Sequence, residues 1–141
     1  MENLFQMELT AAQVNEIPNL SLALVGDGVY ELMCRTHLCA GGDRKLLNLH
    51  RDTVEMVKAP AQARFAEKLL PHLTEEETAV FKRGRNAHGI AIPKSASASQ
   101  YRRATGMEAL FGYLYLEGRE ERLAELFAIG DALSEGGEVD G

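Results

Sequence analysis

The sequence predicts an all-α fold, an irregular bundle of about six or seven helices. Apolar residues recur at helical spacing along most of the chain, and no segment alternates apolar and polar residues as a half-buried strand does. Hydrophobic residues make up 45% of the chain and charged residues 26%, which is typical of a globular protein and excludes a disordered or fibrous one. A length of 141 residues suits one core, so we expect a single domain over residues 1–135 and a flexible, acidic, glycine-rich tail over residues 136–141.

A proline separates the first two predicted helices. Thr10 can cap a short helix over residues 11–16, and Pro18 interrupts the chain because proline disfavours the α conformation in the residue before it. The dense apolar residues that follow, over about residues 20–39, predict a buried central helix. Two glycines at residues 41–42 end this helix.

The middle of the chain predicts two shorter helices. Asp43 can cap a helix whose apolar residues run over 46–57. A further helix follows Pro60 and is closed by Pro71, since proline fits the first helical turn but cannot continue a helix.

A capping box marks the next helix, because Thr74 can accept a bond from an end amide while Glu77 reaches back. This helix is predicted to run to about Asn86 and to give way to a loop over residues 88–99, which is rich in Ala, Ser, Gly and Pro. The last two helices are predicted over residues 100–116 and 119–133.

Basic residues are concentrated in one segment. The net charge is −6, yet residues 82–107 contain six basic residues and no Asp or Glu. The rest of the chain has nine basic and twenty-one acidic residues, a net charge of −12. A segment of one sign in an acidic chain indicates an anionic partner, although charge clusters also occur on ordinary surfaces.

The sequence predicts neither a membrane segment nor a secretory signal. The longest uncharged stretch, residues 17–26, is far shorter than the ~20 apolar residues of a membrane crossing. The first residues lack the basic segment followed by an apolar segment that is typical of a secretory signal, so we expect a cytoplasmic protein.

Cys34 and Cys39 are five positions apart on a predicted helix and project from different faces, which favours free thiols.

Two acidic residues lie in the most apolar helices. Asp27 follows Leu20, Ala23 and Leu24 on its own helix face, and Glu108 is the only charged residue among thirteen positions. A buried carboxylate without a partner costs several kcal/mol, and no Lys or Arg lies at a helical spacing that would pair with either group. A shared Mg²⁺, with Mn²⁺ as a substitute, would satisfy both carboxylates because hard oxygen ligands suit it.

Glycines near both acidic residues would allow the two helices that carry them to pack closely. Gly26 and Gly28 flank Asp27, and Gly106 and Gly112 bracket Glu108, so two helix backbones can approach closely there. An alternative remains open in which Asp27 caps a broken helix at Gly26 and Glu108 satisfies a backbone amide without any metal.

Two segments resemble the signature motifs of the ribonuclease III family. LALVGDGVYEL, residues 22–32, is similar to its leucine-phenylalanine-leucine-glycine-aspartate motif, and GMEALFGYLYLEG, residues 106–118, to its second glutamate-alanine-leucine segment. The stretch between them, with its KRGRNA run, proline-lysine loop and YR-x-x-T helix start, looks like the mini-ribonuclease III branch. The resemblance covers about residues 20–127.

The resemblance implies an all-α endonuclease domain that forms a homodimer and cuts double-stranded RNA with Mg²⁺, leaving 5′-phosphate and 3′-hydroxyl ends. The family's catalytic metal ligands fall on Asp27 and Glu108. At two further positions where the family has acidic residues, this sequence has Leu20 and Thr105, so its site has fewer carboxylate ligands. Glu31 and Thr105 are candidates to support the metal ligands from outside, Thr105 through its hydroxyl or a water.

The resemblance also concerns the RNA. Twenty-five residues after Leu116 leave no room for a double-stranded-RNA-binding domain, so we expect the nuclease domain to hold its substrate alone. A-form RNA offers mainly phosphates and 2′-hydroxyls. The expected contacts are Lys82, Arg83, Arg85, Asn86, Lys94, Arg102 and Arg103, with His88 and Tyr101 as further candidates.

The usual role of this branch implies precursor 23S ribosomal RNA as the substrate and a ribosomal protein as an accessory partner. Two alternatives remain open. In the first, the chain is a dimer that binds double-stranded RNA but cleaves it poorly, because Leu20 and Thr105 replace two acidic ligands. In the second, the acidic C-terminal helix belongs to a protein-interaction adaptor, which predicts no RNA affinity at low salt.

Overall fold

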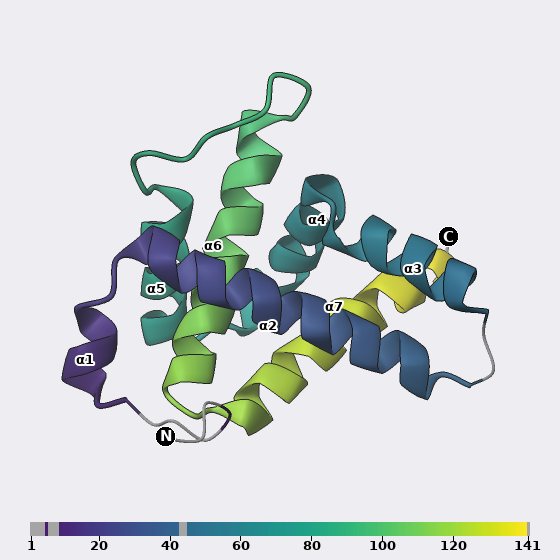
Figure 1. The fold of residues 1–141 in the computed structure, drawn as a ribbon, viewed down its shortest axis with the longest axis horizontal. Helices are drawn as coiled ribbons and strands as arrows, with labels where there is room; N and C mark the ends of the chain where they lie inside the picture. Colours follow the sequence, from purple (N-terminus) through teal and green to yellow (C-terminus); the bar gives the residue numbers. More distant parts are fainter. Residues whose placement is uncertain (1–4, 6–8, 43–44, 141) are drawn as a thin grey trace.

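The computed structural model confirms the all-α fold. It describes residues 5, 9–42 and 45–140, the last nine of these by their backbone alone. This part of the chain contains no strand and no helix long and apolar enough to cross a membrane. Its helices are α1 (Ala11–Asn15), α2 (Asn19–Ala40), α3 (Leu46–Val57), α4 (Ala59–Leu69), α5 (Glu75–Arg85), α6 (Ala98–Leu116) and α7 (Glu120–Asp140), with a 3₁₀ turn, η1 (Leu70–His72), after α4 (Figure 1).

Side-chain caps fix where three of the helices begin. The Thr10 hydroxyl caps α1, and Thr74 and Glu77 form the predicted capping box at the start of α5. Helix α6 begins at Ala98, two residues earlier than the sequence predicts, because the Ser97 hydroxyl accepts a bond from a first-turn amide. Short polar side chains therefore set these boundaries.

Two further predicted boundaries differ from the structure. Asp43 lies outside the described residues, and the N-cap position of α3 is Lys45, whose side chain makes no capping bond. Helix α7 continues through residues 136–140, which the sequence predicts as part of a tail. This stretch contains no proline, and the glycines within it keep helical backbone, whereas Gly41 is the C-cap of α2.

Helix α6 forms the centre of the molecule. Every residue from Ala104 to Leu114 is buried except Glu108, which is half-buried. Helix α2 crosses α6, and α4 and α5 pack on either side of it (Figure 1). Rings from α2, α4, α6 and α7 meet in the core with neighbouring centroids 5.1–6.1 Å apart; they belong to Tyr30, Phe65, Phe111 and Phe127. These edge-to-face and tilted packings hold α6 in place.

A buried ion pair joins α7 to the start of α5. Two nitrogens of Arg122 each lie 2.8 Å from the Glu77 carboxylate, which is only 1% exposed. Arg122 also donates to the carbonyl oxygen of His72. The Arg122 guanidinium lowers the pKa of Glu77. Because a buried charge is costly without its partner, this pair fixes how α7 packs on the rest of the fold.

Both cysteines are free thiols, as the sequence predicts. Cys34 is fully buried, and burial raises the pKa of its thiol to about 11. Cys39 is exposed near the end of α2. Cys34 therefore serves as a small apolar side chain of the core.

Candidate active site

The backbones of α2 and α6 touch where the two helices cross. A Cβ atom added at Gly26 would overlap the carbonyl oxygen of Glu108, and one added at Gly112 would overlap that of Leu22. Only glycine allows two helix backbones to approach this closely. The prediction that glycines bring the two helices together is therefore confirmed at Gly26 and Gly112, whereas a Cβ at Gly28 would meet no atom within 4 Å.

This crossing places the side chains of Asp27 and Glu108 next to each other, within hydrogen-bonding reach. Burial, followed by the hydrogen bond and the negative charge of Asp27, raises the pKa of Glu108 to about 8. In the part of the chain that the structure describes, no lysine or arginine forms an ion pair with either carboxyl group. Without a cation, Glu108 therefore keeps a proton at neutral pH.

The surroundings of Asp27 differ from the sequence prediction. The pattern predicts a carboxylate in a buried apolar stripe, but Asp27 is exposed, and Leu24 beside it is 75% exposed. The reason is that α2 packs on α6 through the face that carries Gly26, which turns Asp27 towards the surface. Because α2 is continuous from Asn19 to Ala40, the alternative in which Asp27 caps a broken helix is wrong.

The chemistry of this pair fits a divalent cation. Two carboxyl groups from different helices meet, one of them half-buried, and their repulsion is relieved in the chain itself only by a proton on Glu108. Among the described residues no group of three or more His, Cys, Asp or Glu side chains could hold a metal ion. A hard cation that retains most of its waters, such as Mg²⁺, suits a site with so few protein ligands.

A third polar side chain, Gln62 of α4, reaches the pair and is absent from the sequence predictions. Gln62 is 2% exposed, and its Nε2 donates to the carbonyl oxygen of Val57 over 2.9 Å. Its side chain also lies within hydrogen-bonding reach of Glu108 and lowers the pKa of that carboxyl group, against the larger effects of burial and Asp27. The signal that singles out Asp27 and Glu108, a polar group on an apolar helix face, applies equally to Gln62 between Ala61 and Phe65.

Glu31 and Thr105, the two predicted supporting residues, are occupied elsewhere. The Glu31 carboxylate lies 3.5 Å from the Arg35 guanidinium on the exposed side of α2. Thr105 is buried, and its hydroxyl donates to the carbonyl oxygen of Tyr101 over 3.0 Å within α6. The structure thus gives each of them a local partner, and their role towards a metal stays a prediction.

The basic segment divides into engaged and free side chains. Arg102 donates to the carbonyl oxygens of Arg85 and Ala87, each over 3.3 Å, and thereby caps the end of α5. Arg103 forms an ion pair with Glu67 of α4. Arg85 stacks over the Phe81 ring and donates to Asn86. Among the lysines and arginines of residues 82–107, those without an ion pair or hydrogen bond to a described residue are Lys82, Arg83 and Lys94.

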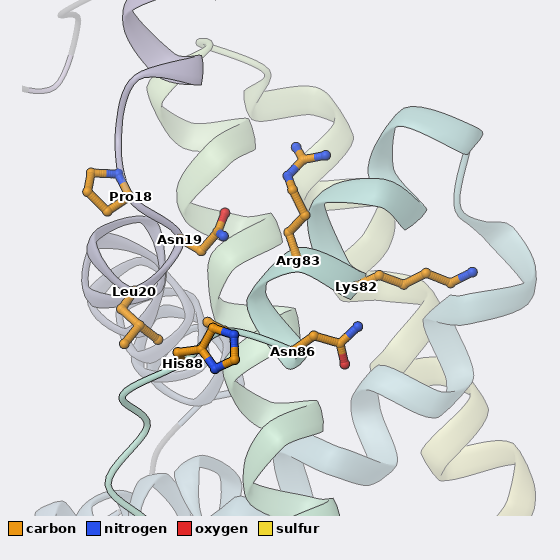
Figure 2. Close-up of a pocket in the computed structure, with 8 residues that line it drawn as sticks. Pro18, Asn19, Leu20, Lys82, Arg83, Asn86 and His88 are labelled. Atoms are coloured by element: carbon orange, nitrogen blue, oxygen red, sulfur yellow. The ribbon is translucent and has the colours of Figure 1, made fainter.

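The free cations of α5 border a cavity of about 500 Å³. Figure 2 shows Asn19 and Leu20, at the start of α2, on one side of it and Lys82 and Arg83 of α5, with its C-cap Asn86, on the other. His88, from the following loop, lies between the two sides. No acidic residue lines this cavity, so it is open to an anion.

The chain is similar to a known protein family over most of its length. Residues 20–119 match the family model described as the ribonuclease III domain. This match contains both Asp27 and Glu108 and the whole basic segment.

Similar proteins are named mini-ribonuclease 3. The relative from Symbiobacterium thermophilum is 47% identical over 110 residues, 78% of this chain and 85% of the relative. The relative from Desulfitobacterium hafniense is 49% identical over 112 residues, 79% of this chain and 71% of the relative. A crystal structure of a Fusobacterium nucleatum protein superposes with a TM-score of 0.75 at 28% identity and covers 83% of this chain and 90% of that one.

Proposed function

This chain belongs to the ribonuclease III family, in its mini-ribonuclease III branch, and is an endoribonuclease of that family; we propose that it cuts double-stranded RNA in an Mg²⁺-dependent reaction that leaves 5′-phosphate and 3′-hydroxyl ends. The observation that carries the proposal is the meeting of Asp27 and Glu108 at the crossing of α2 and α6. Without a cation, the repulsion between the two carboxyl groups is relieved only by a proton on one of them. A divalent ion would neutralise both carboxylates in their ionised form.

Asp27 and Glu108 are the residues that would hold the metal. When bound, Mg²⁺ supplies an activated water and neutralises the negative charge that develops on the attacked phosphate. Glu108 must first release its proton, because only the carboxylate is a ligand. The exposed position of Asp27 leaves the site open to a phosphate from solution, whereas Glu108 is held deeper by α6.

RNA would be held by the free side chains of the basic segment. Lys82, Arg83 and Lys94 have no partner among the described residues, and Asn86 and His88 line the same cavity as the first two. Arg102 and Arg103 were also predicted as RNA contacts; because they bond to carbonyl oxygens and to Glu67, we expect them to contribute less than the free cations. Binding through phosphate contacts weakens steeply with salt, because each contact releases counterions.

A homodimer would bring two such sites to the two strands of a duplex. Leu24, three positions before Asp27 and on the same face of α2, is 75% exposed. Exposed large apolar side chains on one helix face are typical of an interaction surface. A twofold contact through this face would place both Asp27 residues near the symmetry axis, which matches the antiparallel strands of RNA.

The resemblance to mini-ribonuclease III supports precursor 23S ribosomal RNA in the cytoplasm as the substrate, with a ribosomal protein that shapes the RNA as an accessory. The small number of carboxylate ligands supports one further candidate function, that of a dimer that binds duplex RNA but cleaves it poorly. Leu20 faces the basic cavity and Thr105 bonds within its own helix, so neither supplies a carboxylate.

A duplex-cleavage assay separates these two functions. Wild-type protein and Glu108→Gln are incubated with a perfect RNA duplex in Mg²⁺ or in EDTA, and RNA binding is measured in parallel by filter retention. Wild type is expected to release 5′-phosphorylated product only with Mg²⁺, and Glu108→Gln to lose cleavage by about 10³-fold or more while it retains binding. Binding without product in Mg²⁺ would support the catalytically weak dimer.

A further inference from the structure

Among the four buried polar residues of the described chain, Gln62 is the one whose side chain still has a hydrogen-bond donor that its contacts in the fold do not use. The other three buried polar side chains are fully used: Thr53 and Thr105 bond to carbonyl oxygens of their own helices, and Glu77 caps α5 and pairs with Arg122. Gln62 instead uses one N–H of its amide on the carbonyl oxygen of Val57, and its side chain lies within hydrogen-bonding reach of Glu108.

The amide of Gln62 is anchored at a break in the chain. Helix α3 ends at Val57 and α4 begins at Ala59, with Lys58 extended between them. This break leaves the carbonyl oxygen of Val57 outside the helical bonding pattern, and Gln62 Nε2 donates to it over 2.9 Å. The anchor fixes the plane of the amide in a site that is 2% exposed.

The anchored side-chain amide of Gln62 has a second hydrogen-bond donor. The primary amide of glutamine carries two N–H bonds, and one of them is used by Val57. The second N–H can be given to the Glu108 carboxylate, which lies within hydrogen-bonding reach and whose pKa the Gln62 side chain lowers. Because α4 packs directly on α6, this contact joins the half-buried Glu108 to the rigid part of the fold rather than to solvent.

We propose that Gln62 is a positioning residue that holds the Glu108 carboxylate in the orientation needed to bind a divalent cation together with Asp27. This inference rests on the proposed function. Partners of metal ligands fix the ligand's orientation, and their loss typically costs about 10–100-fold in metal affinity or activity. An anchored amide also favours the ionised over the protonated carboxyl group, which a metal requires.

The test replaces Gln62 by Met, which keeps the length and burial of the side chain and removes both N–H donors. Thr53→Val is the matched control, since it removes a buried hydrogen bond to a carbonyl oxygen on α3 without touching Glu108. Mn²⁺ binding is measured by electron paramagnetic resonance without RNA, and kcat and KM are measured on a duplex. Gln62→Met is expected to bind Mn²⁺ about tenfold more weakly and to lose about 10–100-fold in kcat with an unchanged KM, whereas Thr53→Val matches wild type.

Equal Mn²⁺ affinity in Gln62→Met and wild type would overturn the inference and leave the proposed function intact. A wild-type protein that neither binds Mn²⁺ nor cleaves the duplex would overturn both. A second measurement needs no change at Gln62: its side-chain amide signal in an NMR spectrum of wild type is expected to shift as Mg²⁺ is added, and to stay unmoved in Glu108→Gln. An amide signal that Mg²⁺ leaves unmoved in wild type would also contradict the proposal.

Discussion

Glu108 is the residue whose protonation controls the site. Its carboxyl group is half-buried on α6, and Asp27 lies beside it with a second negative charge. Burial and Asp27 raise the pKa of Glu108 to about 8, so a cation must displace a proton at physiological pH. In the proposed function, binding of the metal would therefore release a proton from this residue.

This coupling predicts a pH-dependent affinity for Mg²⁺. Below pH 8 each bound ion releases the Glu108 proton, so the association constant is expected to rise by up to about tenfold per pH unit between pH 6 and 8 and then to level off. Isothermal titration in two buffers of different ionisation enthalpy measures both the affinity and the released proton. An affinity that stays flat across this range would mean that Glu108 is already ionised without metal.

The raised pKa of Glu108 also predicts how the free energy of unfolding changes with pH when EDTA removes metal ions. The folded chain holds the Glu108 proton up to about pH 8, whereas an unfolded chain releases it near the ordinary value of 4.5. The folded state therefore binds more protons between these values, and the free energy of unfolding falls as the pH rises through them. Urea unfolding at pH 5 and pH 8 is expected to show this fall in wild type and a smaller fall in Glu108→Gln.

At the residue scale the sequence indicates the acids but not their partners. A lone carboxyl group in an apolar helix is visible in the sequence, and this pattern indicates both Asp27 and Glu108. The engagement of Arg102 with carbonyl oxygens and of Arg103 with Glu67 depends on how α5 and α4 pack against α6. Such contacts depend on tertiary distances, which one-dimensional charge patterns do not contain.

At the scale of elements, the crossing of α2 and α6 determines the distance between the two acids. Gly26→Ala adds a Cβ that overlaps the carbonyl oxygen of Glu108, and neither backbone can yield cheaply. We expect the free energy of unfolding to fall by about 3 kcal/mol, measured by urea unfolding, together with a loss of cleavage. Gly28→Ala is the control, because its Cβ meets no atom of the chain and replaces a glycine within a helix.

The basic segment allows a prediction that separates binding from folding. Lys82→Gln and Arg83→Gln each remove a free cation, so each is expected to reduce the slope of log affinity against log salt by about 1 and to leave stability unchanged. Arg102→Gln removes the bonds that cap α5, so it is expected to lower the free energy of unfolding with little change in the slope. Fluorescence anisotropy with a duplex RNA at several salt concentrations measures the slopes.

The helices themselves were largely predictable, because their caps and breakers act locally. Thr10, Pro18 and Thr74 mark three helix starts in the sequence and in the structure. The start of α6 was displaced by two residues, since several serines before it are equally good caps. The end of α7 was not predicted, because glycine weakens a helix without fixing where it stops.

At the scale of the whole molecule, the exposed face of α2 predicts the dimer. Leu24→Glu places a charge at the centre of that face, whereas Leu46→Glu, the control, changes an equally exposed leucine on α3. Sedimentation equilibrium is expected to give twice the 15.5 kDa chain mass for wild type and Leu46→Glu, and the single chain mass for Leu24→Glu. Dimers in all three proteins would place the interface elsewhere.

A cation held jointly by α2 and α6 is the central element of the proposed function. Anomalous diffraction from a crystal soaked in MnCl₂ locates such an ion directly. We expect a peak about 2.0–2.3 Å from carboxylate oxygens of both Asp27 and Glu108, and no such peak in a crystal of Glu108→Gln. A wild-type map with no peak between the two carboxylates, at a pH above 8 where Glu108 is ionised, would contradict the account.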